Sequence, residues 1–348
     1  MFLSIKKRID KELVEFAKDI NKDYPLNRIS PLLYRSIKEF ILRPGKRARP
    51  ILFLLAYLGF AKKTPPGLYR SAVSLELLHD FLLVHDDIID RSLVRRGKPS
   101  MQVMLQRHLA AHKHIKFNGQ DLALIVGDVM YALALQAFLS VKEDMHRKEK
   151  AMKKFIATAI YTCGGEFVEL LAGIKNIDKI TKGDIYKIYD FKTAHYTFAS
   201  PLCIGATLAG ADNKQLGLLN KYGIYLGRAF QIKDDYLGIF GLPKDTGKSN
   251  LTDLQESKKT IFVWYAYNHC DGKDKSAIKK IFAKKDPSPR DLLKMRRIIL
   301  LSGTVDYARR EIERLIKMAD SLINTSKMPP RQRDYLNAFA FGLLTLNS

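Results

Sequence analysis

The chain of 348 residues contains few cysteines, and this limits its redox and metal chemistry. Its three cysteines, Cys163, Cys203 and Cys270, lie far apart, and none belongs to a Cys-x-x-Cys pair. This spacing argues against a disulfide framework and against a thiolate zinc site, and it favours a reducing compartment.

Segments that would direct the chain to a membrane are also missing from the sequence. Charged residues interrupt every apolar run near the N-terminus, so we expect no signal peptide. We find no uninterrupted apolar segment of bilayer-spanning length. The 13 prolines and 21 glycines are too few for a disordered or fibrous protein. The sequence therefore predicts a soluble, cytoplasmic protein.

Alternating strand patterns are essentially missing, whereas apolar positions recur at helical spacing nearly everywhere. Helices are expected at about residues 4–20, 31–42, 49–58, 75–92, 100–107, 121–141, 148–171, 182–210, 214–240, 258–268, 274–282, 289–301, 305–323 and 329–346. No linker, composition shift or fixed-period repeat divides the chain. We predict an all-α fold, with residues 1–348 forming a single domain of about ten or more helices around a common interior.

Acidic residues are scarce relative to basic ones, at 36 against 59, which gives a formal net charge of +23. Such an excess favours polyanionic partners: nucleic acid, acidic lipid surfaces or phosphorylated small molecules. A lysine-rich solvated surface without any partner explains the excess equally well. Charge alone does not choose between these explanations.

The most informative stretch is residues 75–90, a mostly apolar helix that ends in Asp86, Asp87 and Asp90. Because a helix turns ~100° per residue, His79, Asp86 and Asp90 share one polar stripe. Two carboxylates at positions i and i+4 of an apolar helix are costly unless a cation lies near them. That cation is either a basic side chain or a metal ion.

A second carboxylate cluster closes the apolar helix that runs from about residue 222 to 238. Its polar residues fall on one helical face: Gln231, Asp234 and Asp235, with Gly238. Two such clusters suggest facing walls that hold hard cations, and oxygen ligands with few carboxylates per ion suit Mg²⁺. The alternative is that each cluster is only a helix end in a wet loop.

Short basic motifs accompany these clusters: Gly45-Lys46-Arg47-Ala48-Arg49-Pro50, Arg95-Arg96-Gly97, Lys192-Thr193, Lys248 and Lys258. A glycine-led turn with three cations is a plausible diphosphate cradle. Each motif alone is more often a solvated run of charge. Their repeated occurrence beside the acidic clusters is what a metal–diphosphate substrate needs.

The motifs resemble those of the trans-type isoprenyl diphosphate synthases, or polyprenyl synthetases, over about residues 30–320. The family's Asp-Asp-x-x-Asp and Arg-Arg-Gly correspond to residues 86–90 and 95–97. Its Gly-Lys-Arg-x-Arg-Pro, Lys-Thr and Phe-Gln-x-x-Asp-Asp correspond to residues 45–50, 192–193 and 230–235. The resemblance implies an all-α bundle around a deep central cavity, usually as a homodimer.

The resemblance also implies roles for individual residues. The isopentenyl diphosphate site would consist of Gly45, Lys46, Arg49, His79 and Arg96. Partners of the allylic diphosphate would be Arg95, Lys192, Thr193, Gln231, Lys248 and Lys258. Several Mg²⁺ ions would bind Asp86, Asp90 and Asp234, and these three with Lys192 would carry the catalysis.

The implied reaction joins isopentenyl diphosphate to dimethylallyl, geranyl or farnesyl diphosphate. Mg²⁺ and fixed cations stabilise the leaving diphosphate, and the double bond of the second substrate attacks the allylic cation. Three positions depart from the family pattern: Gly238 replaces an aspartate, Glu166 a glutamine and Ser257 a glycine.

Product length depends in this family on residues four and five before the first aspartate, here Leu82 and Phe81. A single aromatic at the fifth position resembles the geranylgeranyl type, and farnesyl or longer products (C25 and above) are the alternatives. Phe81 lies ~7.5 Å along the helix from Asp86 and ~140° around it. It either flanks the tail pocket or packs in the core.

Three other classes of protein remain as rivals. A class I terpene cyclase would lack the isopentenyl site at Lys46, Arg49 and His79, and a silent partner subunit would be expected to lose its aspartates. A basic helical protein without enzymatic activity has no nucleic-acid motif to support it. We expect no nucleic-acid partner, and leave open a transient contact with a membrane surface.

Overall fold

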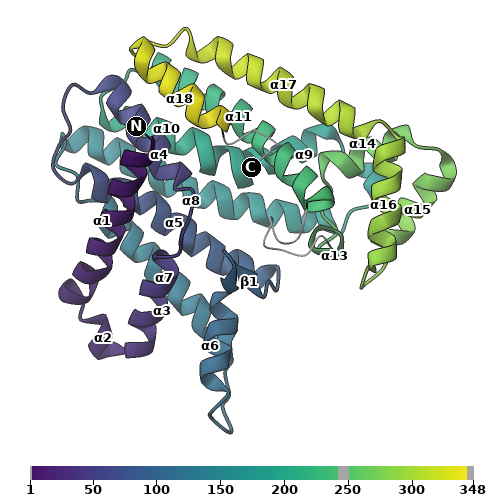
Figure 1. The fold of residues 1–348 in the computed structure, drawn as a ribbon, viewed down its shortest axis with the longest axis horizontal. Coiled ribbons are helices and arrows are strands. Elements are labelled where there is room, and N and C mark those ends of the chain that lie inside the picture. Colours follow the sequence, from purple (N-terminus) through teal and green to yellow (C-terminus); the bar gives the residue numbers. More distant parts are fainter. Residues whose placement is uncertain (1, 242–250, 343–348) are drawn as a thin grey trace. The chain divides into compact units, whose positions relative to one another are not determined.

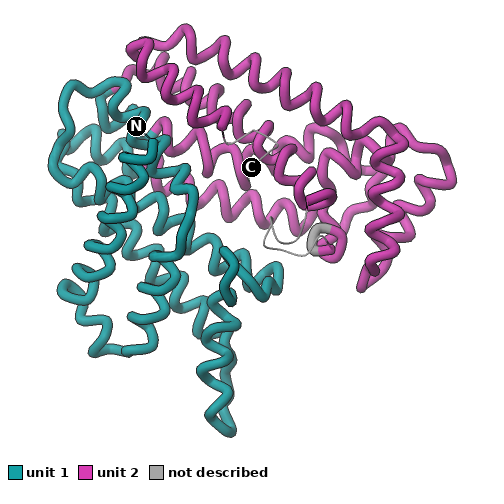
Figure 2. Tube along the Cα trace, viewed as in Figure 1, with its two compact units in different colours: residues 1–152, 204–210 teal, residues 153–203, 211–348 magenta. Residues whose placement is uncertain are grey.

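The computed structural model describes residues 2–241 and 251–342, and its architecture is all-α, as predicted (Figure 1). The chain folds into two compact units, coloured separately in Figure 2. Unit 1 comprises Met1–Met152 and Ile204–Gly210, and unit 2 comprises Lys153–Cys203 and Ala211–Ser348. Two of the three unit boundaries fall inside helices α8 (Met145–Gly173) and α10 (Ser200–Leu208), and the third follows Gly210, so neither unit is one continuous segment.

The other helices of unit 1 are α1 (Phe2–Asp23), α2 (Leu26–Ile29), α3 (Pro31–Ile41), α4 (Ala48–Phe60), α5 (Leu68–Ile89), α6 (Met101–Leu109) and α7 (Gly119–Phe138). Helix α5 packs mainly against α7 and α4, with α1 also beside it. Apolar residues occupy most of its circumference, and Leu75, Leu77, Leu78 and Val84 are at most 1% exposed. A helix that is apolar nearly all round belongs in a core.

Unit 2 contains the 3₁₀ turn η1 (Ile177–Lys179), the π-helix η2 (Tyr189–Ala199), and the α-helices α9 (Lys182–Ile188), α11 (Asn213–Phe240), α13 (Thr252–Gln255), α14 (Ile261–His269), α15 (Gly272–Phe282), α16 (Pro289–Leu301), α17 (Thr304–Ile323) and α18 (Pro330–Gly342). Helix α11 packs against η2 and α17. The helix expected over residues 182–210 is thus three consecutive pieces, α9, η2 and α10. Wider π-turns such as η2 occur often at functional sites.

The sequence did not predict the small hairpin of strands β1 (Val94–Arg95) and β2 (Lys98–Pro99). Its two-residue loop places Arg96 at φ 53° and Gly97 at φ 72°. Two consecutive positive φ angles are the signature of a type I′ turn, whose twist matches antiparallel strands. Gly97 makes this turn accessible, and the Arg-Arg-Gly motif is therefore a structural unit as well as a run of charge.

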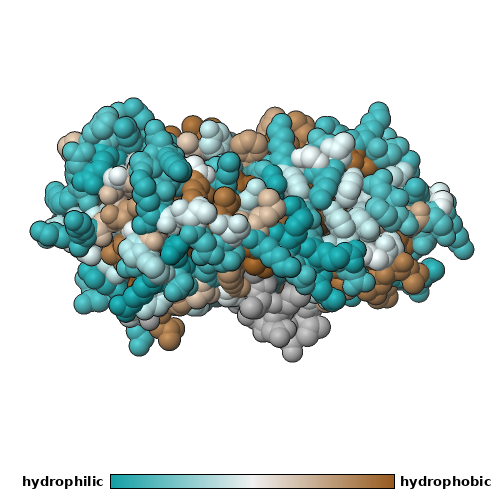
Figure 3. All heavy atoms as spheres, turned by 90° about the horizontal axis from the view of Figure 1, so that it is seen from above, coloured by the Kyte–Doolittle hydropathy of each residue, from teal (hydrophilic) through white to brown (hydrophobic). Residues whose placement is uncertain are grey.

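Helices α7 and α8 are long and apolar enough to cross a membrane by length and composition alone. Charged residues still interrupt both apolar stretches, at Asp121 and Asp128 in α7 and at Glu166 and Glu169 in α8. Core helices of proteins outside membranes pass the same criterion, and 44% and 33% of the two apolar windows are buried. Apolar side chains also surface in separate patches among hydrophilic ones (Figure 3).

Candidate active site

The acidic end of α5 is held by Arg95 from the hairpin. The Arg95 guanidinium donates to Asp87 Oδ1 at 2.8 Å and to Asp86 Oδ2 at 3.0 Å. Asp87 is fully buried, whereas Asp86 and Asp90 are partly exposed. Burial opposes ionisation of Arg95, but the hydrogen bond and charge of Asp87 outweigh it and raise the pKa of Arg95. A basic side chain therefore stabilises Asp86 and Asp87 in this structure.

The three aspartates consequently divide into a structural and an accessible set. Asp87 anchors Arg95 from within the core, and Asp86 and Asp90 lie one turn apart at the accessible end of the helix. All their donor atoms are hard carboxylate oxygens, a set that suits Mg²⁺ better than Zn²⁺ or copper. The donor chemistry fits the metal assignment that the resemblance implied for Asp86 and Asp90.

A buried ion-pair network lies on the same helix, two to three turns before Asp86. Arg96 contacts Asp80 Oδ1 at 3.1 Å and Glu76 Oε1 at 3.2 Å. Arg47 donates to the same Glu76 oxygen at 2.6 Å. Glu76 and Asp80 are 2% and 0% exposed. Burial raises the pKa of Asp80 to about 7. Buried carboxylates this close require fixed cations, which Arg47 and Arg96 provide.

Arg47 and Arg43 hydrogen-bond the segments that surround this network. Arg47 has φ 53° at the N-cap of α4 and also donates to Asp10 Oδ1 at 2.8 Å. Arg43, 1% exposed, donates to the backbone carbonyls of Arg95 at 3.2 Å and Pro99 at 2.9 Å. The hairpin that carries Arg95 and Arg96 is thereby fastened to the segment that carries the Gly45–Pro50 motif.

The residues expected to bind isopentenyl diphosphate all lie in unit 1. Lys46 is exposed, Gly45 and Arg49 are half-buried, and Arg96 belongs to the network above. Burial and then the positive charges of Arg49 and Arg96 lower the pKa of His79 well below its ordinary value. His79 is therefore neutral near pH 7, a donor on one ring nitrogen and an acceptor on the other.

In unit 2, Lys192 of η2 lies between two glutamates of α8. Its ammonium is 2.6 Å from Glu166 Oε2 and also contacts Glu169. Glu166, the glutamate that replaces a glutamine, is thus an ion-pair partner of Lys192. All three side chains are partly exposed, so the lysine keeps access to solvent.

A hydrogen-bonded chain connects η2 with α11. Thr193 Oγ1 donates to Gln231 Oε1 at 2.5 Å, and Gln231 Nε2 donates to Asp235 Oδ1 at 2.8 Å. The hydroxyl of buried Tyr189 donates to Asp235 Oδ2. Burial, and then the negative charge of Asp235, raises the pKa of Tyr189. Asp235 is 6% exposed, whereas Asp234 is exposed. Asp235 is therefore structural, and Asp234 is the accessible carboxylate.

The remaining predicted residues lie near or beyond the end of α11. Lys258 forms an ion pair with Glu256 at 2.5 Å. Ser257 has φ 54°, a left-handed conformation that explains why glycine is usual there in the family. Gly238 is part of α11 and is half-buried. Lys248 lies outside the described residues.

Phe81 and Leu82, the residues expected to limit product length, are both partly exposed on α5. The Phe81 ring lies 5.0 Å from that of Tyr131 on α7 and 4.7 Å from that of His85. His85 in turn lies 3.6 Å from Asp128. Phe81 is thus part of an aromatic cluster across α5 and α7, which the sequence could not show.

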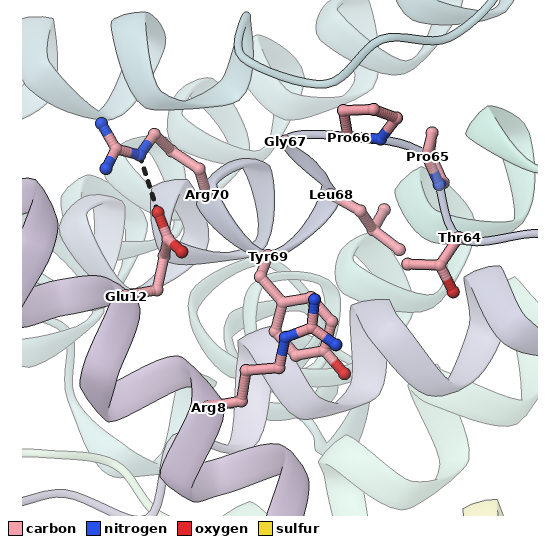
Figure 4. Close-up of a pocket in the computed structure, with 9 residues that line it drawn as sticks. All are labelled: Arg8, Glu12, Thr64, Pro65, Pro66, Gly67, Leu68, Tyr69 and Arg70. Atoms are coloured by element: carbon pink, nitrogen blue, oxygen red, sulfur yellow. Dashed lines mark hydrogen bonds and ion pairs between the residues drawn. The ribbon is translucent and has the colours of Figure 1, made fainter.

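A separate cavity of about 450 Å³ lies at the opposite end of α5, lined by α1 and the loop before α5 (Figure 4). Arg8 covers the Tyr69 ring at 3.7 Å, and Arg70 donates to Glu12 at 2.7 Å. This cavity contains none of the motif residues and is distinct from the acidic end of the helix.

Sequence reasoning did not select the inner residues of the site: Arg43, Glu76, Asp80, Tyr189 and Glu169. A signal was present for two of them, because Glu76 and Asp80 repeat the i, i+4 carboxylate spacing of Asp86 and Asp90 on the same apolar helix. Their partners come from distant segments and leave no local pattern.

Comparison with known proteins identifies the class. Residues 30–299 match the polyprenyl synthetase family. The geranylgeranyl diphosphate synthase of Sulfolobus acidocaldarius is 30% identical, covering 94% of this chain and 96% of the relative. The geranylfarnesyl diphosphate synthase of Aeropyrum pernix is 31% identical, covering 84% and 87%.

The fold is also that of solved members. A crystal structure of the geranylgeranyl pyrophosphate synthase from Corynebacterium glutamicum, complexed with isoprenyl diphosphate and magnesium, matches with a TM-score of 0.88 at 23% identity over 99% of both chains. The chain is therefore a prenyltransferase with the all-α fold of these enzymes. It belongs to the polyprenyl synthetase family.

Proposed function

We propose that this protein is a Mg²⁺-dependent isoprenyl diphosphate synthase whose main product is geranylgeranyl diphosphate. It joins isopentenyl diphosphate to dimethylallyl, geranyl or farnesyl diphosphate head to tail (1′-4) and releases diphosphate. The observation that carries this proposal is the accessible pair Asp86 and Asp90 beside a guanidinium 3.0 Å from Asp86, in a chain of this family.

In this proposal Asp86, Asp90 and Asp234 would hold Mg²⁺, which when bound would supply positive charge to the leaving diphosphate. Arg95, Lys192, Thr193, Gln231, Lys248 and Lys258 bind the allylic diphosphate. Lys192 and Arg95 are already oriented by carboxylates, so their charges are fixed before substrate arrives. Preorganised charge of this kind lowers the barrier to breaking the carbon–oxygen bond.

Gly45, Lys46, Arg49, His79 and Arg96 bind isopentenyl diphosphate. Arg96 is held by Glu76 and Asp80, and neutral His79 donates a hydrogen bond without adding charge. The double bond of this substrate attacks the allylic cation, and the departing diphosphate accepts the proton. The protein positions the two substrates and stabilises the developing charge, and it supplies no nucleophile.

A turnover assay tests the proposal. Purified protein with Mg²⁺, isopentenyl diphosphate and farnesyl diphosphate should yield the twenty-carbon product by chromatography. EDTA or Asp86→Ala should abolish turnover, whereas Asp286→Ala, at an exposed position in the loop between α15 and α16, serves as the matched control. Full activity with EDTA would refute the metal assignment.

The same assay separates the rival functions. Cyclised hydrocarbon product would indicate a terpene cyclase, and no turnover without a second protein would indicate a silent subunit. Products of fifteen carbons, or of twenty-five and more, would retain the reaction and overturn the chain length. The chain's similarity to a geranylfarnesyl diphosphate synthase makes the longer product the principal alternative.

A homodimer of single-domain, cytoplasmic protomers completes the proposal, and α8 supports it. Apolar or thiol side chains recur along this helix at alternating four- and three-residue steps: Ile156, Ile160, Cys163, Phe167 and Leu170, and Ile174 continues the series just beyond its C-terminal end. All six are exposed, with Ile160 at 63% and Phe167 at 65%. This is the heptad seam of paired helices, and a second copy of α8 would cover it.

A further inference from the structure

Helix α16 has an outer face with an unusual composition. Its inner side chains, Asp291, Leu292, Met295, Ile298 and Ile299, are buried in unit 2. Its outer face carries three leucines and three basic residues: Arg290, Leu293, Lys294, Arg297, Leu300 and Leu301. At ~100° per residue, these six side chains fall within an arc of roughly 120°.

The three leucines on the outer face are largely exposed to solvent, and the helix does not need them to bury its apolar face. Leu293, Leu300 and Leu301 are 62%, 58% and 69% exposed, although a continuous apolar face is already buried on the other side. The only acidic residue of α16 is Asp291, which is turned inward and pairs with Lys284 at 2.7 Å. The outer arc is therefore purely basic and apolar.

From this face we infer that α16 docks the protein peripherally onto an anionic lipid bilayer. Arg290, Lys294 and Arg297 meet the lipid headgroups, and the three leucines between them enter the boundary with the acyl chains. Long basic side chains reach headgroups while their stems lie on apolar surface. The inference is independent of the proposed catalytic function.

Charge complementarity favours an anionic lipid bilayer over another protein surface as the partner of α16. The chain's charge of +23 adds a long-range attraction to anionic membranes, and the local arc adds the short-range contacts. Each basic side chain near an anionic surface strengthens binding about five-fold at moderate salt. Three of them with three inserting leucines suffice for reversible binding that salt weakens.

Vesicle sedimentation with the full chain tests the inference. Phosphatidylcholine vesicles with 30% phosphatidylglycerol should bind the protein, and vesicles of pure phosphatidylcholine should not. The triple variant Arg290→Gln/Lys294→Gln/Arg297→Gln should weaken binding at least tenfold. Leu300→Ser/Leu301→Ser should also weaken it severalfold without changing the melting temperature.

Matched controls remove the same charge and apolar area elsewhere. Lys62→Gln/Lys63→Gln/Lys116→Gln and Leu3→Ser/Ile29→Ser change exposed residues outside α16 and should bind as the wild type. Equal loss in the charge control would overturn the inference in favour of net charge alone. A change of oligomeric state in the leucine variant, measured by light scattering, would overturn it in favour of a protein interface.

Discussion

At the residue scale, each aspartate motif contains an adjacent pair in which one side chain is buried and the other is accessible. Asp87 and Asp235 are buried and hydrogen-bonded to Arg95 and Tyr189, while Asp86 and Asp234 remain accessible. Adjacent residues of a helix point about 100° apart, so a doubled aspartate naturally supplies one side chain to the core and one to solvent. The paired motif thus combines support with binding.

Phe81 is the residue whose substitution should change the product. Phe81→Ala removes the ring that contacts Tyr131 and His85 and opens space below Asp86, so we expect a shift to products at least one isoprene unit longer. Tyr131→Ala should shift the spectrum in the same direction, since the two rings support each other. Product chain length by mass spectrometry is the measurement.

Phe117→Ala, which removes an exposed ring 47% accessible to solvent, is the control and should leave the products unchanged. An unaltered product spectrum in Phe81→Ala would show that this ring belongs only to the core.

Glu311 should make stability depend on acid pH. Hydrogen bonds from Arg314 lower its pKa to about 2, with Tyr186 and Lys182 also contributing. A folded-state pKa below the unfolded value near 4.3 stabilises the fold above that pH, and this contribution is lost as the pH falls towards about 2. Glu311→Gln should cost about 1–2 kcal/mol at pH 7 and almost nothing at pH 2.

Urea unfolding at the two pH values measures this difference. The exposed neighbour Glu313→Gln should have little effect at either pH. A cost for Glu311→Gln that is the same at both pH values would contradict the assigned cause.

At the scale of elements, close packing of α11 on η2 brings their polar residues together. A Cβ at Gly223 would lie 2.4 Å from Ala199 Cα, and one at Gly227 would lie 2.3 Å from Ala194 Cα. Only glycine allows this approach, which aligns Thr193 with Gln231. The π-helix directs Thr193 towards α11 and Lys192 towards the glutamates of α8, so backbone geometry and small residues together shape this part of the site.

Gly227→Ala should therefore destabilise the protein by about 1–3 kcal/mol through overpacking and should reduce turnover by disturbing the Thr193–Gln231 contact. Gly217→Ala on the same helix is the matched control, because nothing lies within 4 Å of its added methyl. The control should gain up to about 1 kcal/mol from helix propensity. Melting temperatures measure both effects, and equal behaviour of the two variants would contradict this account.

At the scale of the whole molecule, the α8 seam should determine the oligomeric state. Phe167→Glu places a charge in the middle of the exposed apolar stripe and should convert the dimer to a monomer by light scattering. The Cys163 thiol in the same stripe should react slowly with a thiol reagent in the dimer and faster in the variant. Ile29→Glu, an exposed position in unit 1, is the control. A wild-type monomer at micromolar concentration would contradict the dimer.

The helical class and nearly every helix could be predicted from the sequence, because apolar periodicity is a local property. The assignment of Asp86, Asp90, Lys192 and Asp234 to the site rests on motif spacing and the resemblance, and it stays a prediction. The sequence did not show the hairpin at Arg96, since a two-residue turn between very short strands leaves almost no pattern, and η2 was expected as ordinary α-helix. Glu166 also had no assigned partner until the fold placed Lys192 beside it.

Which charged and polar groups pair with one another could be seen only in the three-dimensional structure. Arg95 lies on Asp86 and Asp87, Arg47 and Arg96 on Glu76, and Tyr189 on Asp235. These partners come from separate segments, and the cost of burying an unpaired charge makes their meeting obligatory once α5 and α11 enter the core. The local sequence pattern specifies which buried polar groups need a partner. The packing of the helices specifies which residue provides that partner.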